Sequence, residues 1–262
     1  MDRLVEIIAN KRLQLESAKA LTGLDQVRRE AQSRRRNAPV QALRQALSNA
    51  GSNIIAEFKR RSPSKGVIRA NADPAVVARS YLRGGAAAIS VLTEENFFDG
   101  SLDDLRAVKE AVSLPVLRKD FIVDEYQIYE AAAAGADAVL LIVAALEDEQ
   151  LVSLRELTEE LGMDALVEVH DSVEMKLAAS TGATLIGVNN RDLRTFHVSL
   201  ETSIKLAGKA PKDAVLISES GLGSATDLQR LRSVGYRGFL IGESLMRAEN
   251  PEELLRALLS WT

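Results

Sequence analysis

The sequence repeats one pattern eight times: a short apolar run rich in β-branched residues, a polar or glycine-rich turn, and a longer amphipathic segment. The apolar runs predict strands at residues 53–58, 86–92, 115–120, 136–143, 165–169, 184–189, 214–220 and 238–242. Their apolarity is continuous rather than alternating, which is typical of parallel strands covered on both faces. The pattern predicts a single-domain α/β fold, a closed (β/α)8 TIM barrel. A doubly wound open sheet is the alternative, but no G-x-G-x-x-G follows the first strand.

The amphipathic segments between the strands predict a helix in each unit. These helices are expected at residues 74–83, 102–112, 126–134, 147–161, 173–180, 200–207, 225–234 and 251–259. Ser224 with Asp227 three residues later has the form of a capping box, and Asn250 before Pro251 is a cap followed by a first-turn proline. Glycines that suit a left-handed helix stop follow several helices, at Gly85, Gly135, Gly162, Gly182 and Gly235.

Residues 1–50 have no strand character and predict a helical extension to the barrel domain, residues 51–262. Helices are expected over residues 2–20 and about 39–50, packing on the barrel or covering its mouth. The extension has ten Lys/Arg against five Asp/Glu, which leaves 23 against 32 for the remainder. Its arginine clusters at 28–29 and 34–36 can contact nucleic acid, but a solvated helical face is favoured because no aromatic residues are interleaved.

Composition narrows the classes of protein further. The chain has no cysteine and two histidines, which excludes disulfides and thiolate metal sites and disfavours imidazole-rich ones. The start of the chain lacks the apolar core of a signal peptide, and no apolar window is long enough to span a bilayer. We therefore expect a soluble cytoplasmic protein with no nucleic-acid or membrane partner, present as a monomer or weak dimer.

Polar side chains gather where the predicted strands finish. Glu57 and Lys59 point to the same side of the first strand, because extended side chains alternate. A surface salt bridge explains this pair taken alone, but the other strand ends are equally polar. They contribute Arg118, Lys119 and Asp120; Glu168 and His170; Asn189, Asn190 and Arg191; Ser218, Glu219 and Ser220; and Gly242, Glu243 and Ser244. Because catalytic residues of such barrels stand at the carboxyl ends of the strands, one shared site is predicted there.

Two features predict what this site holds. The glycine turns SESGLGS and IGESLMR follow the last two strands, where barrels of this type bind phosphate, although ordinary turns are the simpler alternative. Lys119 and Glu168 are expected to face each other across the mouth, around a small molecule. Apolar residues can exclude water from the site and so shift the pKa of Lys119 or Glu168 towards neutral pH, although each of them taken alone is more simply an ordinary core residue. They are Phe98, Phe121, Leu140, Ile142 and Leu193.

The stretches EFKRRSPSKG, LTEENFFDGS, LRKDFIVDEYQI, ADAVLLIV, LVEVH, GVNNRDL, SESG and IGESLM together resemble the indole-3-glycerol phosphate synthase family of tryptophan biosynthesis. The resemblance runs in order and at consistent spacing from the N-terminal helices to the last strand. It implies conversion of 1-(2-carboxyphenylamino)-1-deoxy-D-ribulose 5-phosphate into indole-3-glycerol phosphate, CO2 and water. The substrate's own amine can take up the electrons released by decarboxylation, so neither a cofactor nor a metal is expected.

The resemblance also implies roles for individual residues. Lys119 matches the general acid that protonates the ketose oxygen, and Glu168 matches the general base of the dehydration. Glu57 and Lys59 orient the sugar portion and share proton transfer, so the two lysines can exchange roles. Asn189, Arg191 and Glu219 are further polar site residues. Ser62, Ser220, Gly221, Gly242 and Glu243 fall at phosphate-contacting positions, and Phe98, Phe121, Leu140 and Leu193 surround the anthranilate ring.

Glu243 departs from the small residue that some relatives carry, and a carboxylate aimed at phosphate would repel it. We expect this residue to use its backbone N–H with the side chain turned away. Two rival functions are open on sequence alone. One is an isomerase or epimerase of another sugar phosphate, which needs no aromatic pocket. The other is a non-catalytic phosphate-sensing barrel, which would tolerate loss of Lys119 and Glu168.

Overall fold

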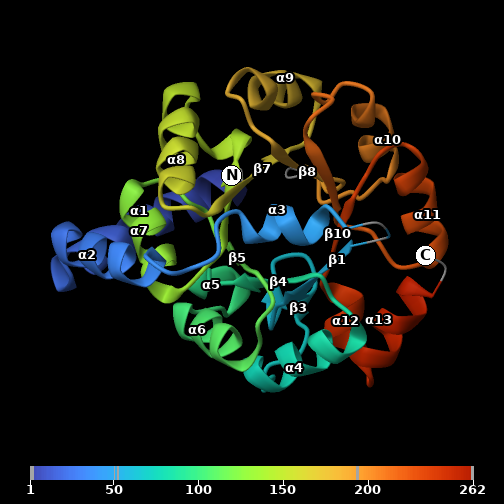
Figure 1. The fold of residues 1–262 in the computed structure, drawn as a ribbon, viewed down its shortest axis with the longest axis horizontal. Coiled ribbons are helices and arrows are strands. Elements are labelled where there is room, and N and C mark those ends of the chain that lie inside the picture. Colours follow the sequence, from blue (N-terminus) through green and yellow to red (C-terminus); the bar gives the residue numbers. More distant parts are fainter. Residues whose placement is uncertain (1–2, 50, 52, 193–194, 261–262) are drawn as a thin grey trace.

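A computed structural model describes residues 3–49, 51, 53–192 and 195–260, and its centre is a ring of parallel strands (Figure 1). The ring closes in the order β1-β10-β9-β8-β7-β6-β5-β4. Its strands are β1 (Asn53–Phe58), β4 (Ala88–Leu92), β5 (Val116–Lys119), β6 (Ala138–Ile142), β7 (Asp164–Val169), β8 (Leu185–Asn189), β9 (Val215–Glu219) and β10 (Gly238–Ile241). Each lies within one residue or two of a predicted run. The (β/α)8 barrel is confirmed, and closure rules out the open sheet.

The predicted helices form the outer layer of the barrel (Figure 1). They are α4 (Pro74–Gly84), α6 (Leu102–Ala111), α7 (Glu125–Ala134), α8 (Asp148–Glu160), α9 (Ser172–Ser180), α10 (Glu201–Ala207), α11 (Ala225–Ser233) and α13 (Pro251–Leu259). Ser224 and Asp227 form the predicted capping box, and the Asn250 side chain accepts from the backbone of Glu253. Positive φ angles at Gly85, Gly135, Gly162, Gly182 and Gly235 confirm the expected helix stops.

Four short elements in the loops after the strands were not predicted. They are the hairpin of β2 (Arg61–Ser62) and β3 (Gly66–Val67), α5 (Glu95–Phe98), the 3-10 turn η1 (Val143–Ala145) and α12 (Glu243–Arg247). Each is shorter than two helical turns or one ordinary strand, so no hydrophobic period can reveal it. All of them lie at the carboxyl end of the barrel and shape its mouth.

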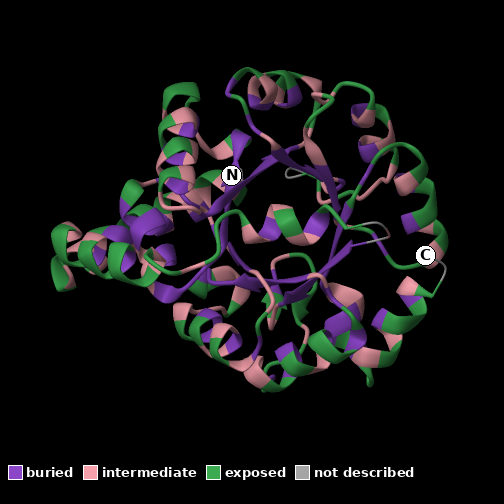
Figure 2. Ribbon diagram, in the orientation of Figure 1, coloured by how far each residue is buried: buried purple, intermediate pink, exposed green. Residues whose placement is uncertain are grey.

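The interior of the barrel is apolar and is closed at one end by α3 (Ala42–Leu47). Leu43 and Leu47 are fully buried among the inward-facing residues of the strands. The backbone N–H groups of Leu43 and Arg44 donate to Asp164 Oδ2 at 2.9 and 3.1 Å. Asp164 begins β7, so α3 covers the end where the strands start, and it lies across the ring in Figure 1. The eight barrel strands are buried except for Lys119, Asn189 and Val215 at strand ends, which are intermediate (Figure 2).

The first helix, α1 (Arg3–Leu21), lies at the opposite end of the barrel. Lys11 Nζ is 2.8 Å from Asp120 Oδ1 in a buried ion pair, and Asp120 directly follows β5. The extension therefore contacts the mouth through α1 and the closed end through α3, which combines the two predicted placements.

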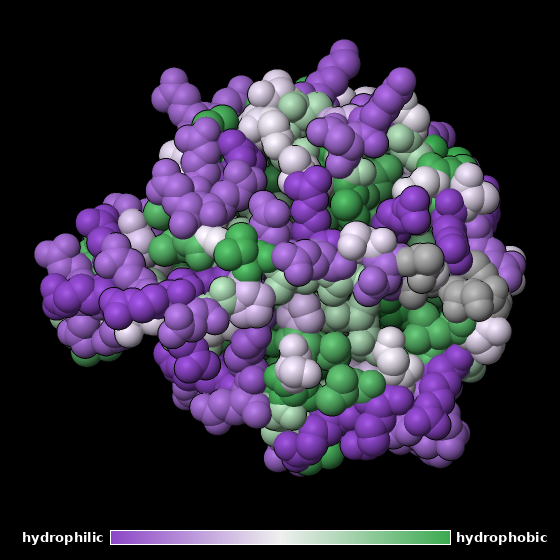
Figure 3. All heavy atoms as spheres, in the orientation of Figure 1, coloured by the Kyte–Doolittle hydropathy of each residue, from purple (hydrophilic) through white to green (hydrophobic). Residues whose placement is uncertain are grey.

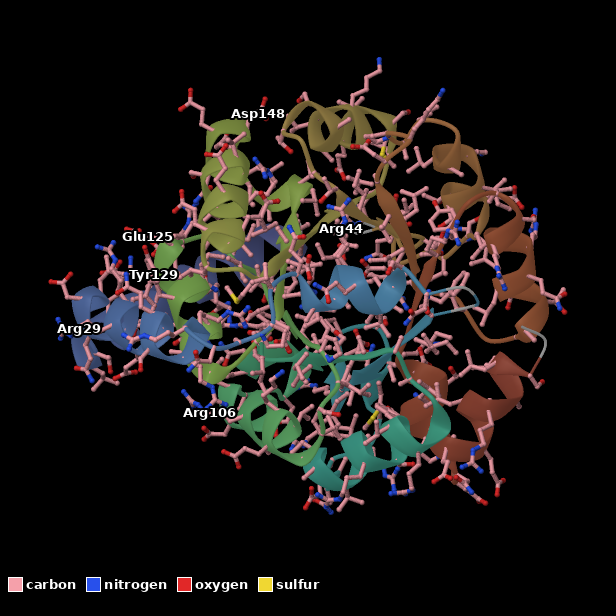
Figure 4. The ribbon with its side chains drawn as sticks, in the orientation of Figure 1. Arg29, Arg44, Arg106, Glu125, Tyr129 and Asp148 are labelled. Carbon is pink, nitrogen blue, oxygen red and sulfur yellow. The ribbon has the colours of Figure 1, made fainter. Side chains whose placement is uncertain are left out.

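The arginine-rich helix α2 (Leu24–Arg35) packs against α7. The guanidinium of Arg28 lies 5.0 Å from the ring centre of Tyr129, and Figure 4 shows Arg29 on α2 beside the labelled residues of α7. Hydrophilic atoms dominate the projecting end of α2 in Figure 3, as predicted for a solvated face. Arg35 differs, because its side chain is only 6% exposed and donates to the carbonyls of Leu161 and Gly162.

Candidate active site

The centre of the site is a lysine, 14% exposed, between two buried glutamates. Lys119 Nζ at the end of β5 lies 3.1 Å from Glu168 Oε2 of β7 and 2.8 Å from Glu219 Oε2 of β9. Asn189 of β8 donates to the other oxygen of Glu168 at 3.2 Å. These four residues come from four strands, so their meeting depends on closure of the barrel.

Burial and charge together set the ionisation of this group. Burial lowers the pKa of Lys119, but Glu168, Glu219 and Glu57 outweigh it and hold that pKa above the ordinary lysine value. Burial raises the pKa of Glu168, but Lys119 and His170 reverse the effect and hold it well below its usual range.

Glu219 behaves differently from its neighbour. Burial raises the pKa of Glu219 to about 7, and the nearby charge of Glu168 adds to this while Lys119 opposes it. Its Oε1 atom is buried and has no hydrogen-bond partner. The prediction that a dry site moves Lys119 or Glu168 towards neutral pH is therefore wrong, because their mutual attraction exceeds desolvation. Glu219 is the group that titrates near neutrality.

A second ion pair stands on β1 and just beyond it. Lys59 Nζ is 2.5 Å from Glu57 Oε1, so the alternation of side chains placed both groups on one side as predicted. Glu57 is buried and the Lys59 side chain is 16% exposed. The surface salt bridge considered from sequence alone is excluded, because both residues line the central cavity.

The cavity above these pairs has a volume of about 810 Å³ and receives nearly every predicted site residue. Its lining includes Glu57, Lys59, Ser62, Phe98, Lys119, Phe121, Leu140, Ile142, Glu168, Asn189, Arg191, Glu219, Ser220, Gly221, Gly242 and Glu243. Leu193, also predicted to line it, lies outside the described residues. The rings of Phe98 and Phe121 have centroids 6.2 Å apart and form one apolar wall.

The glycine turns after β9 and β10 line the other side of the cavity. Ser220 and Gly221 have φ angles of 68° and 78°, and a non-glycine residue in this region is uncommon. The Glu243 side chain turns to basic residues, with Oε1 3.3 Å from Arg247 Nε and 3.7 Å from Lys65 Nζ. Its carboxylate is thus paired with two cations that also line the cavity, and the use of its backbone N–H for phosphate stays a prediction.

Two glycines make room for the buried carboxylates. A Cβ atom on Gly242 would collide with the carboxylate of Glu57, and one on Gly187 would collide with that of Glu219. The close approach of a side chain, rather than an unusual φ, requires glycine at both positions. Gly242 was predicted only for phosphate contact.

Some lining residues were not predicted. Arg3, Leu4 and Ile7 of α1 reach the cavity, as do Lys65, Phe196 and Arg247 from loops and α12. Helical periodicity showed that α1 buries one face but did not identify the surface it covers. His170 was noted at its strand end without a role, and it lies 3.3 Å from Glu168.

Neither a metal site nor a membrane segment is found in the part of the chain that the structure describes. No group of three or more His, Asp or Glu among those residues is arranged to hold a metal ion. No described helix combines the length and apolarity needed to cross a bilayer.

Comparison with solved structures identifies the same barrel in other proteins. 3-Hexulose-6-phosphate synthase from Salmonella typhimurium matches with a TM-score of 0.65 at 16% identity, over 79% of this chain and 97% of that one. Thiamine phosphate pyrophosphorylase from Pyrococcus furiosus matches with a TM-score of 0.60 at 16% identity, over 82% and 95%. At this identity the likeness concerns the fold alone.

Sequence relatives are much more similar. An indole-3-glycerol phosphate synthase from Bacteroides thetaiotaomicron is 47% identical over 259 residues, 98% of each chain. One from Desulfosudis oleivorans is 51% identical over 218 residues, 83% of each chain. The profile of the family described as "Indole-3-glycerol phosphate synthase" matches residues 4–258. The chain therefore belongs to the indole-3-glycerol phosphate synthase family.

Proposed function

We propose that this chain converts 1-(2-carboxyphenylamino)-1-deoxy-D-ribulose 5-phosphate into indole-3-glycerol phosphate, CO2 and water, the activity for which its family is named. The observation that carries the proposal is the ion pairing of Lys119 with both Glu168 and Glu219 in an apolar-walled cavity. An ammonium group held charged can donate a proton, and a neighbouring carboxylate can accept one.

The proposed pose of the substrate follows the two sides of the cavity. The phosphate lies at the turns that contain Ser220, Gly221 and Gly242, with the Glu243 backbone. The carboxyphenyl ring lies against Phe98, Phe121 and Leu140. Arg191 lines the same cavity, and its Nη1 donates to Ser64 Oγ at 3.3 Å, which links the loops after β8 and β1 across the mouth.

Ring closure comes first in the proposed reaction. The ring carbon that bears the carboxylate attacks the ketose carbonyl, and the carbonyl oxygen takes a proton from Lys119. Glu219 is 2.8 Å from Lys119 and titrates near neutrality, so it is suited to return that proton. CO2 then leaves, and the bonding pair neutralises the iminium of the substrate's own amine and restores the aromatic ring. The electrons therefore stay within the substrate.

Dehydration completes the indole. Glu168 removes a proton from the carbon beside the nitrogen, and that bonding pair forms the new double bond as the hydroxyl leaves. The hydroxyl departs as water with a proton from an ammonium group. Lys59 is the second lysine near the bound sugar, and we propose that it shares this proton transfer while Glu57 orients it.

An assay with the carboxyphenylamino-deoxyribulose phosphate tests the proposal, because indole fluorescence reports product directly. We expect turnover by the full chain without added metal, and a loss of at least about 100-fold in kcat for Lys119→Ala. Circular dichroism checks that the variant is folded, and Lys205→Ala on the exposed face of α10 is the matched control. Full activity of Lys119→Ala would refute the assignment.

The apolar wall argues against a plain sugar-phosphate isomerase, whose substrate has no aromatic ring to place against Phe98 and Phe121. Ribulose 5-phosphate offered alone provides the comparison. We expect no conversion of it, and efficient isomerisation would favour the rival function.

A further inference from the structure

His170 contacts the oxygen of Glu168 that Lys119 leaves free. Its Nε2 lies 3.3 Å from Glu168 Oε1, the atom that also accepts from Asn189, whereas Lys119 contacts Oε2. Nε2 has no hydrogen-bond partner, so its contact with the carboxylate is electrostatic rather than a hydrogen bond. The two oxygens of Glu168 therefore have separate partners.

His170 is in turn held by the start of α9. Glu174 Oε2 lies 3.1 Å from His170 Nδ1 and also accepts from the His170 backbone N–H at 2.7 Å. Asp171 caps α9 by accepting from the backbone of Glu174 at 3.0 Å, which fixes that residue's position. The His170 side chain is 12% exposed, so the ring lies largely inside the protein with a carboxylate beside each nitrogen.

The surroundings of His170 favour its charged form. Glu168 faces it from β7 and Glu174 faces it from α9. It also borders a second cavity of about 530 Å³, whose other titratable lining groups are Asp171, Arg191, Asp192 and His197. Burial lowers the pKa of His170, but the two carboxylates reverse this and raise it to about 10.

The positive charge of His170 affects the step in which Lys119 protonates the ketose oxygen. When Lys119 turns to the ketose oxygen, Glu168 loses the cation that keeps it ionised. A carboxylate whose side chain is 3% exposed would then take up a proton and cease to be a base, unless another cation stayed beside it. His170 does not line the central cavity, so substrate binding leaves it in place.

We propose that His170, clamped between Glu174 and Glu168, is a positioning residue that holds Glu168 ionised, with Oε1 occupied and Oε2 presented to the substrate. The proposal rests on the function proposed above. His170 touches Glu168 and not the reacting atoms, so its removal should affect kcat far more than KM.

Steady-state kinetics of His170→Asn test this across about pH 5.5 to 9. We expect kcat to fall at least about tenfold, KM to stay within about twofold, and the acidic limb of kcat to move upward by about one pH unit. His170→Gln introduces a longer side chain that is also polar and uncharged. It should likewise leave the acidic limb of kcat displaced upward. Unchanged kcat with an unchanged limb, or a loss confined to KM, would overturn the proposal.

Two further variants keep the test valid if His170→Asn unfolds. Glu174→Gln preserves the ring and its packing, and should give a smaller fall in kcat that deepens as pH rises and the ring loses its proton. A flat ratio to wild type across the pH range would count against the role. His197→Asn is the matched control, because His197 lines the same second cavity but is exposed, and its profile should equal that of wild type.

The ring can also be observed without catalysis. The chain has two histidines, so nitrogen-15 NMR of the full chain gives two imidazole patterns, and His197→Asn assigns them. We expect both nitrogens of His170 to be protonated at about pH 8, and a neutral ring there would overturn the proposal. If the chain does not turn over the substrate, the proposed function fails while this measurement still decides the charge of His170.

Discussion

Lys119 and Glu168 are joined directly by an ion pair of 3.1 Å, although only a gap for a small molecule between them was expected from sequence. β6 alone separates their strands in the barrel, so a lysine side chain is long enough to cross. In the free protein each group neutralises the other. A ligand that binds between them must therefore supply a new partner to each group. This requirement favours molecules that place a proton acceptor beside Lys119.

Glu168→Gln is expected to stop the reaction after decarboxylation. A neutral amide fills the same space and can still contact Lys119, but it cannot remove the proton whose loss forms the indole double bond. Rapid-quench samples analysed by mass spectrometry should contain a decarboxylated species that has not lost water. Its absence would remove Glu168 from the dehydration step.

Glu219→Gln is expected to change the pH dependence of kcat. Because the pKa of Glu219 is raised to about 7, the carboxyl holds its proton below that pH and loses it above. If it returns the proton to Lys119, wild-type kcat falls as pH rises through about 7. The variant should be slower and flat over this window. Coincident profiles would exclude the role, and Glu201→Gln, exposed on α10, should follow wild type.

Gly187→Ala tests whether the position of Glu219 matters. The added Cβ meets the Glu219 carboxylate, so the Lys119–Glu219 contact must lengthen. We expect kcat to fall at least about tenfold, since small misplacements of catalytic groups cost up to about 100-fold. Gly208→Ala is the control, because its Cβ meets nothing within 4 Å and its φ is −74°. Equal activity of the two variants would show that Glu219 tolerates displacement.

The buried ion pair of Lys11 and Asp120 joins α1 to the end of β5, and we expect it to stabilise the folded state. Burial raises the pKa of Asp120, but Lys11 and Arg118 reverse this and lower it to about 2 from 3.8. A depressed carboxyl pKa stabilises the folded state above the unfolded value. This contribution, roughly 2 kcal/mol, is lost as pH falls from about 4 to about 2.

Asp120→Asn should therefore lower the free energy of unfolding by about 3 kcal/mol at neutral pH, since it removes the carboxylate that pairs with the buried Lys11. The difference from wild type should shrink towards about pH 2, as urea denaturation at several pH values would show. Asp103→Asn, in an exposed pair with Arg106, should change stability by less than about 1 kcal/mol. A constant difference across pH would mean that Asp120 acts through packing instead.

Glu243→Gln is expected to tighten binding of the phosphorylated substrate. The carboxylate engages Lys65 and Arg247 and cancels part of their positive charge beside the glycine turns. Its removal should lower KM about twofold to fivefold at low ionic strength, with kcat unchanged and the effect reduced by salt. A higher KM would indicate that the side chain itself supports the site.

The barrel could be predicted because continuous apolar runs and helix-ending glycines are local signals. The site followed from it, because a barrel brings strand ends together. What could not be predicted is the direction in which each neighbouring charge shifts the pKa of the others once the barrel brings these groups together. The pKa of Glu168 is lowered because Lys119, His170 and Asn189 outweigh its burial, whereas the pKa of Glu219 is raised because burial and the charge of Glu168 outweigh Lys119. Except for His170, these residues come from different strands and meet only when the barrel closes. The destinations of α1 and α3 were equally open, because periodicity identifies an apolar face but not the surface that receives it.

The position of α3 determines the end of the barrel at which substrate enters and product leaves. With Leu43 and Leu47 seated in the strand-start end of the barrel, reactant and indole product share the opposite rim as their way in and out. The product must therefore dissociate through this opening before another substrate molecule can bind. We expect the product to be a competitive inhibitor with respect to the substrate.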